Sequence, residues 1–238
     1  MTSSPPPIAF ALDFSTTEEA LAAAREVAPA IGMVKVGLEL FVGAGPSIVG
    51  IGKDVGLPVF LDLKLHDIPE TVERAVGQAS QLGARLVTVH AAGGRTMLRR
   101  AVERADKDGA GLAICAVTIL TSLDDKDLGD LGMAGPSADA AVRLAKMAWE
   151  EGVRWFVCSP AEVAGLRAAL GKDAILVTPG VRPASAEKGD QKRVATPEDA
   201  IKSGASWVVV GRPIRDAKDR LAAARAIGDS IASVRAHS

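Results

Sequence analysis

Short runs of β-branched and aliphatic residues alternate along this chain with longer, alanine-rich segments of helical period. The predicted strands are residues 8–13, 33–37, 59–64, 86–90, 112–118, 155–159, 175–178 and 207–211. Helical patterns lie between them, at 17–30, 68–82, 96–105, 137–151, 160–170, 196–203 and 215–232. Strands that alternate with helices form parallel sheets, and eight of them over this length are typical of a (β/α)8 barrel.

An open, doubly wound sheet is the alternative fold. That fold usually carries a glycine-rich fingerprint directly after its first strand, and here that position reads LDFSTTEEA, without such glycines. The chain has 238 residues, which suits one α/β barrel, and no linker or shift in composition divides it. We therefore expect a flexible N-terminal tail at 1–7 and a single α/β barrel domain at 8–238.

Composition and charge argue against several classes of partner. The formal net charge is −1, so bulk electrostatics do not favour nucleic acid. No apolar stretch approaches the roughly 18 residues of a membrane span, and the N-terminus lacks the basic residues of a signal peptide. Cys115 and Cys158 each lie in an apolar run and are expected to be buried free thiols. These features predict a cytoplasmic protein.

Polar residues or glycine end almost every predicted strand. They are Asp13, Lys35, Asp62 with Lys64, His90, Thr118 with Thr121, Ser159, Thr178, and Gly211 with Arg212. In α/β barrels the catalytic groups gather at the carboxyl ends of the strands. Buried charges are costly unless they are paired, so a purely structural barrel gains nothing from them. The pattern favours an enzyme.

The segment FLDLKLHDIP places opposite charges at the end of a strand. Asp62 and Lys64 are two residues apart, so both are expected to face the barrel mouth, and Lys35 and Asp67 extend them into an alternating array. A lysine between carboxylates keeps its positive charge. That property suits a proton donor and argues against a Schiff-base nucleophile, which requires a neutral amine. The alternative is a salt-bridge ladder with a purely structural role.

Glycine and arginine residues late in the chain predict a phosphate site. Gly211 and Arg212 follow the last predicted strand, where α/β barrels commonly bind phosphate. A guanidinium group matches phosphate in a bidentate manner. Arg182 and Gln191 belong to the preceding loop at 181–194 and are placed to fold over a ligand. The other long break, at 122–136, is expected to be a second loop on the same face.

Seven segments occur in an order that resembles one known family. They are KVGLELF, FLDLKLHDIP, VTVHAAGG, TILTS, VTPGVRP, GDQKR and VVVGRPI, and together they closely resemble the orotidine 5′-phosphate decarboxylase family. The resemblance extends from Ala11 to about Ile214. It implies the decarboxylation of orotidine 5′-phosphate to uridine 5′-phosphate in pyrimidine nucleotide synthesis. It also implies a homodimer that uses no metal or organic cofactor.

The resemblance further implies roles for individual residues. Lys64 would protonate C6 of the pyrimidine, with Asp62 near the departing carboxylate. Asp13 and Lys35 would bind the ribose. The remaining site residues would be Asp67, Ile68 and Thr71 from the partner subunit, Thr121 and Ser122 near the base, and Arg182, Gln191, Gly211 and Arg212 at the phosphate. His90 is not among these residues, and we expect it to support the charged network.

Two other functions compete with this interpretation. One is a metal-dependent sugar-phosphate decarboxylase or aldolase that uses the D-x-K-x-x-D carboxylates for a divalent cation. Against it, Lys35 and Lys64 would crowd that cation. The other is a barrel that binds phosphate without catalysis, which predicts nucleotide binding without turnover.

Overall fold

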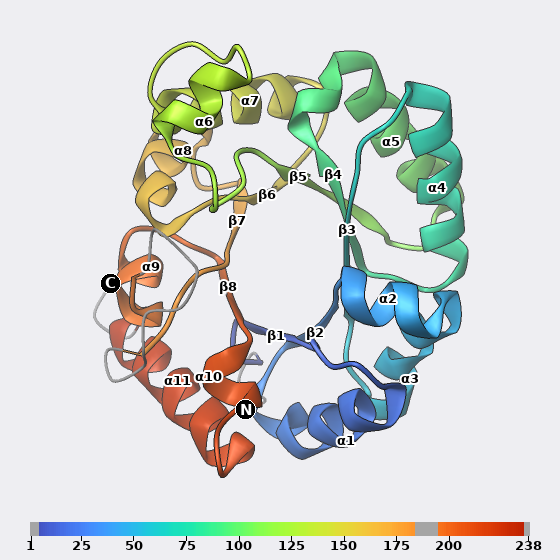
Figure 1. The fold of residues 1–238 in the computed structure, drawn as a ribbon, viewed down its shortest axis with the longest axis vertical. Helices are drawn as coiled ribbons and strands as arrows, with labels where there is room; N and C mark the ends of the chain where they lie inside the picture. Colours follow the sequence, from blue (N-terminus) through green and yellow to red (C-terminus); the bar gives the residue numbers. More distant parts are fainter. Residues whose placement is uncertain (1–4, 184–194, 236–238) are drawn as a thin grey trace.

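The computed structural model describes residues 5–183 and 195–235, and the strands within them form one closed parallel barrel (Figure 1). They are β1 (Ile8–Ala11), β2 (Met33–Val36), β3 (Val59–Leu65), β4 (Leu86–His90), β5 (Ala113–Val117), β6 (Trp155–Val157), β7 (Ile175–Thr178) and β8 (Trp207–Val210). Strand β1 pairs with both β2 and β8, which closes the ring. The predicted (β/α)8 barrel is confirmed, and closure excludes the open sheet.

Helices surround this barrel on the outside (Figure 1). The longer ones are α1 (Thr17–Val27), α4 (Pro69–Gln81), α5 (Gly94–Asp108), α7 (Ser137–Glu150), α8 (Val163–Leu170) and α11 (Arg220–Arg235). The shorter ones are α2 (Leu38–Ala44), α3 (Ile51–Val55), α6 (Asp125–Asp130), α9 (Pro197–Lys202) and α10 (Arg212–Arg215). The short 3-10 helices are η1 (Ala28–Ala30), η2 (Pro46–Gly50), η3 (Ala91–Gly93) and η4 (Pro160–Glu162). The expected loop at 122–136 therefore contains a helix, and the helix expected at 215–232 begins five residues later, at Arg220.

Threonine side chains fix the starts of two helices. The Thr16 hydroxyl accepts a hydrogen bond from the backbone N–H of Glu19 at 3.3 Å and caps α1. Thr196 caps α9 in the same way, through the N–H of Asp199 at 3.1 Å. Such caps satisfy N–H groups that have no partner inside the helix. Both starts agree with the sequence prediction to within one residue.

The core has two layers. The larger layer lies between the strands and the helices and consists mostly of Ala, Val, Leu and Ile. A smaller cluster contains Ala9, Ala11, Met33, Phe60, Leu86, Cys115, Val177 and Val209. The members of this second cluster come from seven neighbouring strands, so they fill the inside of the ring. The barrel is thus a packed core, and the cavity at the carboxyl ends of its strands lies above this layer.

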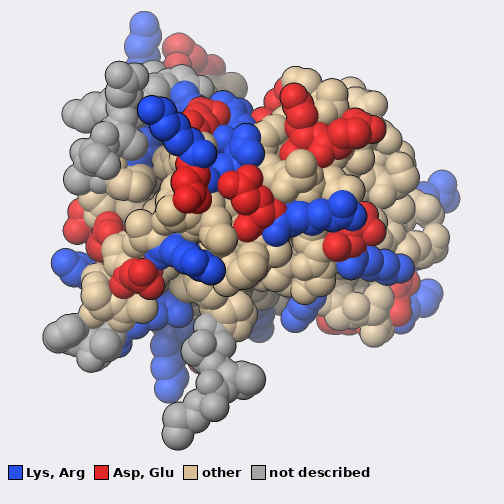
Figure 2. All heavy atoms as spheres, turned by 90° about the horizontal axis from the view of Figure 1, so that it is seen from below, with Lys and Arg blue, Asp and Glu red and all other residues tan. Residues whose placement is uncertain are grey.

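The surface carries mixed charge. Figure 2 shows one face on which acidic and basic side chains are interspersed. Among the helices of the described residues, none is long and apolar enough to cross a lipid bilayer.

Within the expected tail, Pro7 is buried and its carbonyl oxygen accepts a hydrogen bond from the N–H of Val208 at 3.0 Å.

Candidate active site

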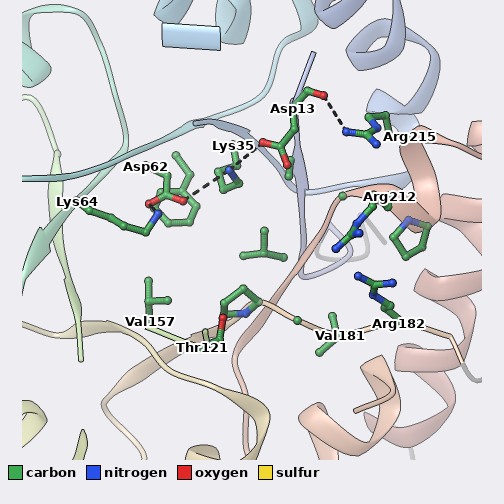
Figure 3. A pocket seen from close by; sticks show the side chains of 17 residues that line it. Asp13, Lys35, Asp62, Lys64, Thr121, Val157, Val181, Arg182, Arg212 and Arg215 are labelled. Carbon is green, nitrogen blue, oxygen red and sulfur yellow. Dashed lines mark hydrogen bonds and ion pairs between the residues drawn. The ribbon is translucent and has the colours of Figure 1, made fainter. Parts of the chain in front are cut away.

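A cavity of about 520 Å³ opens at the carboxyl ends of the strands (Figure 3). Its charged lining residues are Asp13, Lys35, Asp62, Lys64, Arg182, Arg212 and Arg215. The remaining lining residues are Ala11, Phe60, Thr121, Val157, Pro179, Gly180, Val181, Val209, Gly211 and Pro213. Phe60, Ala11 and Val209 also belong to the inner core cluster, so this layer forms the floor of the cavity.

Four charged side chains form a continuous array on one side of the cavity (Figure 3). Lys35 Nζ lies 3.4 Å from Asp13 Oδ1 and 3.6 Å from Asp62 Oδ2. Lys64 Nζ lies 2.8 Å from the other carboxylate oxygen, Oδ1 of Asp62. The order Asp13, Lys35, Asp62, Lys64 therefore alternates in sign across three adjacent strand ends. The predicted array contained Lys35, Asp62 and Lys64 with Asp67 at its end, whereas in the single chain Asp13 completes it.

Asp62 stays ionised inside this array. Its burial alone would raise the pKa of the carboxyl group. The positive charges of Lys35 and Lys64, together with hydrogen bonds from Lys64 and Thr88, outweigh burial and lower that pKa below the usual value of 3.8. A permanent negative charge is therefore held beside the ammonium group of Lys64.

The backbone of β3 departs from regular geometry at Lys64. The residue has a φ of 53°, and no other non-glycine residue in the described ranges has a positive φ. The pairing between β3 and β4 also shifts in register between Leu61 and Leu65. The regular strand alternation assumed from the sequence is therefore wrong here, although the structure does place both Asp62 and Lys64 in the cavity. A left-handed conformation costs a non-glycine residue about 1–2 kcal/mol, and such strain is concentrated at functional sites.

Gly37 makes room for the array. A Cβ atom at this position would lie 2.9 Å from Lys35 Nζ and 3.4 Å from Asp13 Oδ1. Any larger residue would therefore push the lysine ammonium out of its place between the two carboxylates. The glycine of the KVGLELF segment thus has a steric role in the site.

Arginine side chains extend toward the cavity from the opposite side (Figure 3). Arg212 is the first residue of α10, directly after β8, and Gly211 precedes it in the cavity wall. Arg182 follows the β7 strand; its side chain is buried and its backbone N–H donates to the carbonyl of Ala195 at 3.0 Å. Gly180 in the same turn has a φ of 79°, a conformation that favours glycine.

Arg215 is a cavity residue that the sequence analysis missed. Its Nη1 donates to the backbone carbonyl of Asp13 at 3.1 Å, and its Nε donates to the carboxylate of Asp216 at 2.6 Å. It stands three residues after Arg212, a spacing that places two side chains on the same side of a helix. The segment GRPIR contains this spacing of two arginines, which is the sequence signal for Arg215.

The other predicted residues are distributed differently. Thr121 lines the cavity, whereas Ser122 is exposed and does not. Asp67, Ile68 and Thr71 are exposed at the start of α4 and line no part of this cavity in the single chain. The carboxylate of Asp67 instead accepts a hydrogen bond from the N–H of Ile68 at 2.6 Å. The prediction for Gln191 lies outside the described residues.

His90 pairs with His66 beside the charged array. The two rings have centroids 5.3 Å apart. Burial lowers the pKa of His90, and electrostatic interaction with His66 and Lys64 lowers it further, against the opposing effect of Asp62. A neutral imidazole at this position adds no charge to the array, and the supporting role expected for His90 stays a prediction.

Comparison with known proteins identifies the family. The family model described as "Orotidine 5'-phosphate decarboxylase / HUMPS family" matches residues 6–227. The chain belongs to this family. The match includes every strand of the barrel and every residue that lines the cavity.

Individual relatives of the orotidine 5′-phosphate decarboxylase family agree with this. An orotidine 5′-phosphate decarboxylase of Anaeromyxobacter sp. (strain K) is 56% identical over 224 residues, covering 94% of this chain and 97% of the relative. The enzyme of that name from Thermobifida fusca is 50% identical, with 94% and 95% covered. The crystal structure of orotidine 5′-phosphate decarboxylase from Lactobacillus acidophilus has a TM-score of 0.83 and 37% identity, covering 95% of this chain and 99% of that one.

Proposed function

We propose that this chain decarboxylates orotidine 5′-phosphate to uridine 5′-phosphate and carbon dioxide, a step in pyrimidine nucleotide synthesis. The observation that carries this proposal is the contact between Lys64 and Asp62 inside a cavity whose opposite side carries arginine. Family membership and the names of the relatives support it.

The reaction requires a fixed cation near the pyrimidine ring. When the bond between C6 and the carboxylate breaks, its electron pair remains on C6, which has no adjacent electron sink. An ammonium group placed in advance stabilises this charge without reorganising at the moment of reaction. Lys64 then transfers a proton from Nζ to C6, and water returns a proton to the amine. Because Asp62 stays ionised, its negative charge lies 2.8 Å from Lys64 Nζ in the resting enzyme.

The remaining residues would bind the substrate on either side of this centre. We assign the ribose hydroxyl groups to Asp13 and Lys35, which form one end of the array. We assign the phosphate to Arg182, Arg212 and the N–H of Gly211, with Gln191 as a further ligand. Thr121 lines the cavity where the base would lie, and Ser122 follows it in the chain. Binding energy from a remote phosphate group can contribute to transition-state stabilisation at C6.

Chelation separates this reaction from the metal-dependent alternative. Lys64 Nζ and Lys35 Nζ face the two different oxygens of the Asp62 carboxylate, so a divalent cation there would lie beside two positive charges. We therefore expect EDTA to leave turnover unchanged. Loss of activity with EDTA and its recovery with magnesium would support the sugar-phosphate decarboxylase or aldolase instead.

The proposal includes a homodimer with shared active sites. Ile68 is 67% exposed, and Leu38 and Val42 on α2 are 53% and 78% exposed. These apolar side chains follow the adjacent strands β2 and β3 at the same end of the barrel. A second copy that covers them would bring Asp67 and Thr71, from the start of α4, toward its partner's cavity.

A mixing experiment tests the shared site. A chain with Lys64→Ala and a chain with Asp67→Ala are each expected to be nearly inactive. When they exchange subunits, one of the two sites in each mixed dimer contains both native residues, so activity returns. If mixing restores nothing although mixed dimers form, Asp67 acts within its own chain or not at all.

The proposed location is the cytoplasm. Both Cys115 and Cys158 are buried free thiols, as expected, which suits a reducing compartment.

The function itself is tested by mixing the purified protein with orotidine 5′-phosphate and following the ultraviolet absorbance of the orotate ring. We expect a steady decrease and one carbon dioxide released for each uridine 5′-phosphate formed. Binding of uridine 5′-phosphate without any turnover of orotidine 5′-phosphate would support the non-catalytic barrel.

A further inference from the structure

We propose that Thr88 is a positioning residue for Lys64, because its single hydroxyl group holds the Lys64 backbone and the Asp62 carboxylate at the same time. Thr88 lies in the middle of β4 and is completely buried. It does not line the cavity, so it acts through its neighbours and does not touch the substrate. The inference rests on the proposed decarboxylation for its kinetic test.

Both contacts of the hydroxyl group run to β3. The backbone N–H of Lys64 donates to Thr88 Oγ1 at 2.7 Å. The same oxygen donates its proton to Asp62 Oδ1 at 3.1 Å. A backbone N–H can only donate and an ionised carboxylate can only accept, so the direction of both bonds is fixed. An aliphatic side chain of the same shape, such as valine, can make neither contact.

These contacts occur where β3 needs support. Leu61 pairs with Val87, and the next pair along the two strands is Leu65 with Val89. Four residues of β3 therefore lie opposite two residues of β4. Lys64 lies within this irregular stretch and has the positive φ of 53°. A strained conformation persists only when its surroundings hold it in place. The Thr88 hydroxyl group supplies an acceptor for the N–H of that residue.

The position of the Lys64 ammonium group therefore depends on Thr88. Asp62 Oδ1 accepts from both Thr88 Oγ1 and Lys64 Nζ, so one hydroxyl group fixes the backbone of the lysine and the carboxylate that its side chain meets. Without it, the Lys64 backbone can relax toward an ordinary strand conformation. The ammonium group would then move away from the point where charge develops on C6.

The variants Thr88→Val and Thr88→Ser separate this role from simple packing. Valine keeps the shape and removes the hydroxyl group, whereas serine keeps the hydroxyl group and removes the methyl. A misplacement of about 1 Å can cost roughly 10²-fold in rate, so we expect Thr88→Val to lower kcat by about that factor. We expect Thr88→Ser to retain most of the wild-type kcat, and the Kd for uridine 5′-phosphate to change little in either variant.

Thr118→Val is the matched control. Thr118 is also buried, and its hydroxyl group donates to the carbonyl of Val157 at 3.1 Å, away from β3. We expect this variant to lose some stability while keeping its kcat. The inference is overturned if Thr88→Val retains the wild-type kcat, if Thr118→Val loses as much, or if serine does not rescue.

A crystal structure of Thr88→Val tests the positioning itself without turnover, so its result stands even if the wild type proves not to be a decarboxylase. We expect φ of Lys64 to leave the positive region and the distance between Lys64 Nζ and Asp62 to exceed 4 Å. An unchanged Lys64 would overturn the inference. If Thr88→Val does not fold, Thr88→Ala, whose smaller side chain cannot clash, replaces it in both measurements.

Discussion

Lys64 Nζ lies 2.8 Å from Asp62 Oδ1, and the backbone that carries this ammonium group has a left-handed conformation. The two residues are separated by only one position in the chain, so the irregularity of β3 and the contact between the side chains occur together. Lys35 contacts the second oxygen of the same carboxylate at 3.6 Å. The site is thus organised around Asp62, and several consequences can be measured.

Asp62 should make the free energy of unfolding depend on pH in the acidic range. The folded state lowers the pKa of Asp62, because the two lysines outweigh burial. The stabilisation is therefore fully present above the unfolded pKa of about 3.9 and is lost as the pH falls through the lower folded value. We expect the unfolding free energy of the wild type to fall more steeply below pH 4 than that of Asp62→Asn. Asp173→Asn, which removes an exposed carboxylate, should follow the wild type; parallel curves for all three proteins would contradict this.

Gly37→Ala should damage activity more than stability. The added methyl group would lie 2.9 Å from Lys35 Nζ, and the flexible end of the lysine can move away at small cost to folding. Because displacement by about 1 Å can cost roughly 10²-fold, we expect kcat/KM to fall by about 10- to 100-fold. In Gly43→Ala, on α2, the new Cβ meets no atom within 4 Å. That control should keep its activity, and a Gly37→Ala enzyme of normal activity would show that Lys35 need not occupy its observed place.

Arg212→Ala should weaken the binding of phosphorylated ligands selectively. A hydrogen bond to a charged group contributes about 1.5–3 kcal/mol, which corresponds to roughly a 10- to 100-fold rise in the Kd of uridine 5′-phosphate. Binding of uridine, which lacks the phosphate, should change far less. Calorimetric titration of both ligands measures the difference, with Lys218→Ala as a variant that removes the same charge from an exposed position nearby. Equal losses for nucleotide and nucleoside would contradict a phosphate site at Arg212.

Neither cysteine should react in the folded protein. Burial raises the pKa of Cys158 to about 12, and burial raises that of Cys115 well above its ordinary value. The thiolate is the reactive form, so both groups stay unreactive at neutral pH. A chromogenic disulfide reagent should detect no thiol in the native protein and two per chain in denaturant. Rapid reaction of either thiol without denaturant would show that the barrel opens readily.

The barrel could be predicted from the sequence because the same pattern, an aliphatic strand followed by a helical segment, is repeated along the chain. Strands such as β4 and β7 were placed with correct ends, since aliphatic runs and the glycines that follow helices mark them clearly. The short helices α2, α3 and α6 were not predicted. They have five to seven residues, which is too few for a helical period to become visible.

The candidate site was predicted in its composition but not in its local geometry. Strand ends in a parallel barrel meet at one face, so Asp13, Lys35, Asp62 and Lys64 could be grouped from sequence order alone. The positive φ of Lys64 could not be predicted from the sequence, because a lysine has no preference for that conformation. The residue that supports it, Thr88, lies 24 residues later in the chain. The contact of Arg215 with the Asp13 carbonyl spans 202 residues and likewise depends on the closed ring.

The central claim is that the ammonium group of Lys64 stabilises the charge on C6 and supplies its proton. Its most direct test compares single-turnover decarboxylation of orotidine 5′-phosphate by the wild type and by Lys64→Ala, with circular dichroism to confirm that both are folded. General-acid groups contribute about 10²–10⁴-fold, and this residue also supplies the electrostatic stabilisation, so we predict a loss of at least roughly 10³-fold with the affinity for uridine 5′-phosphate largely kept. A folded Lys64→Ala protein that decarboxylates at close to the wild-type rate would contradict the account.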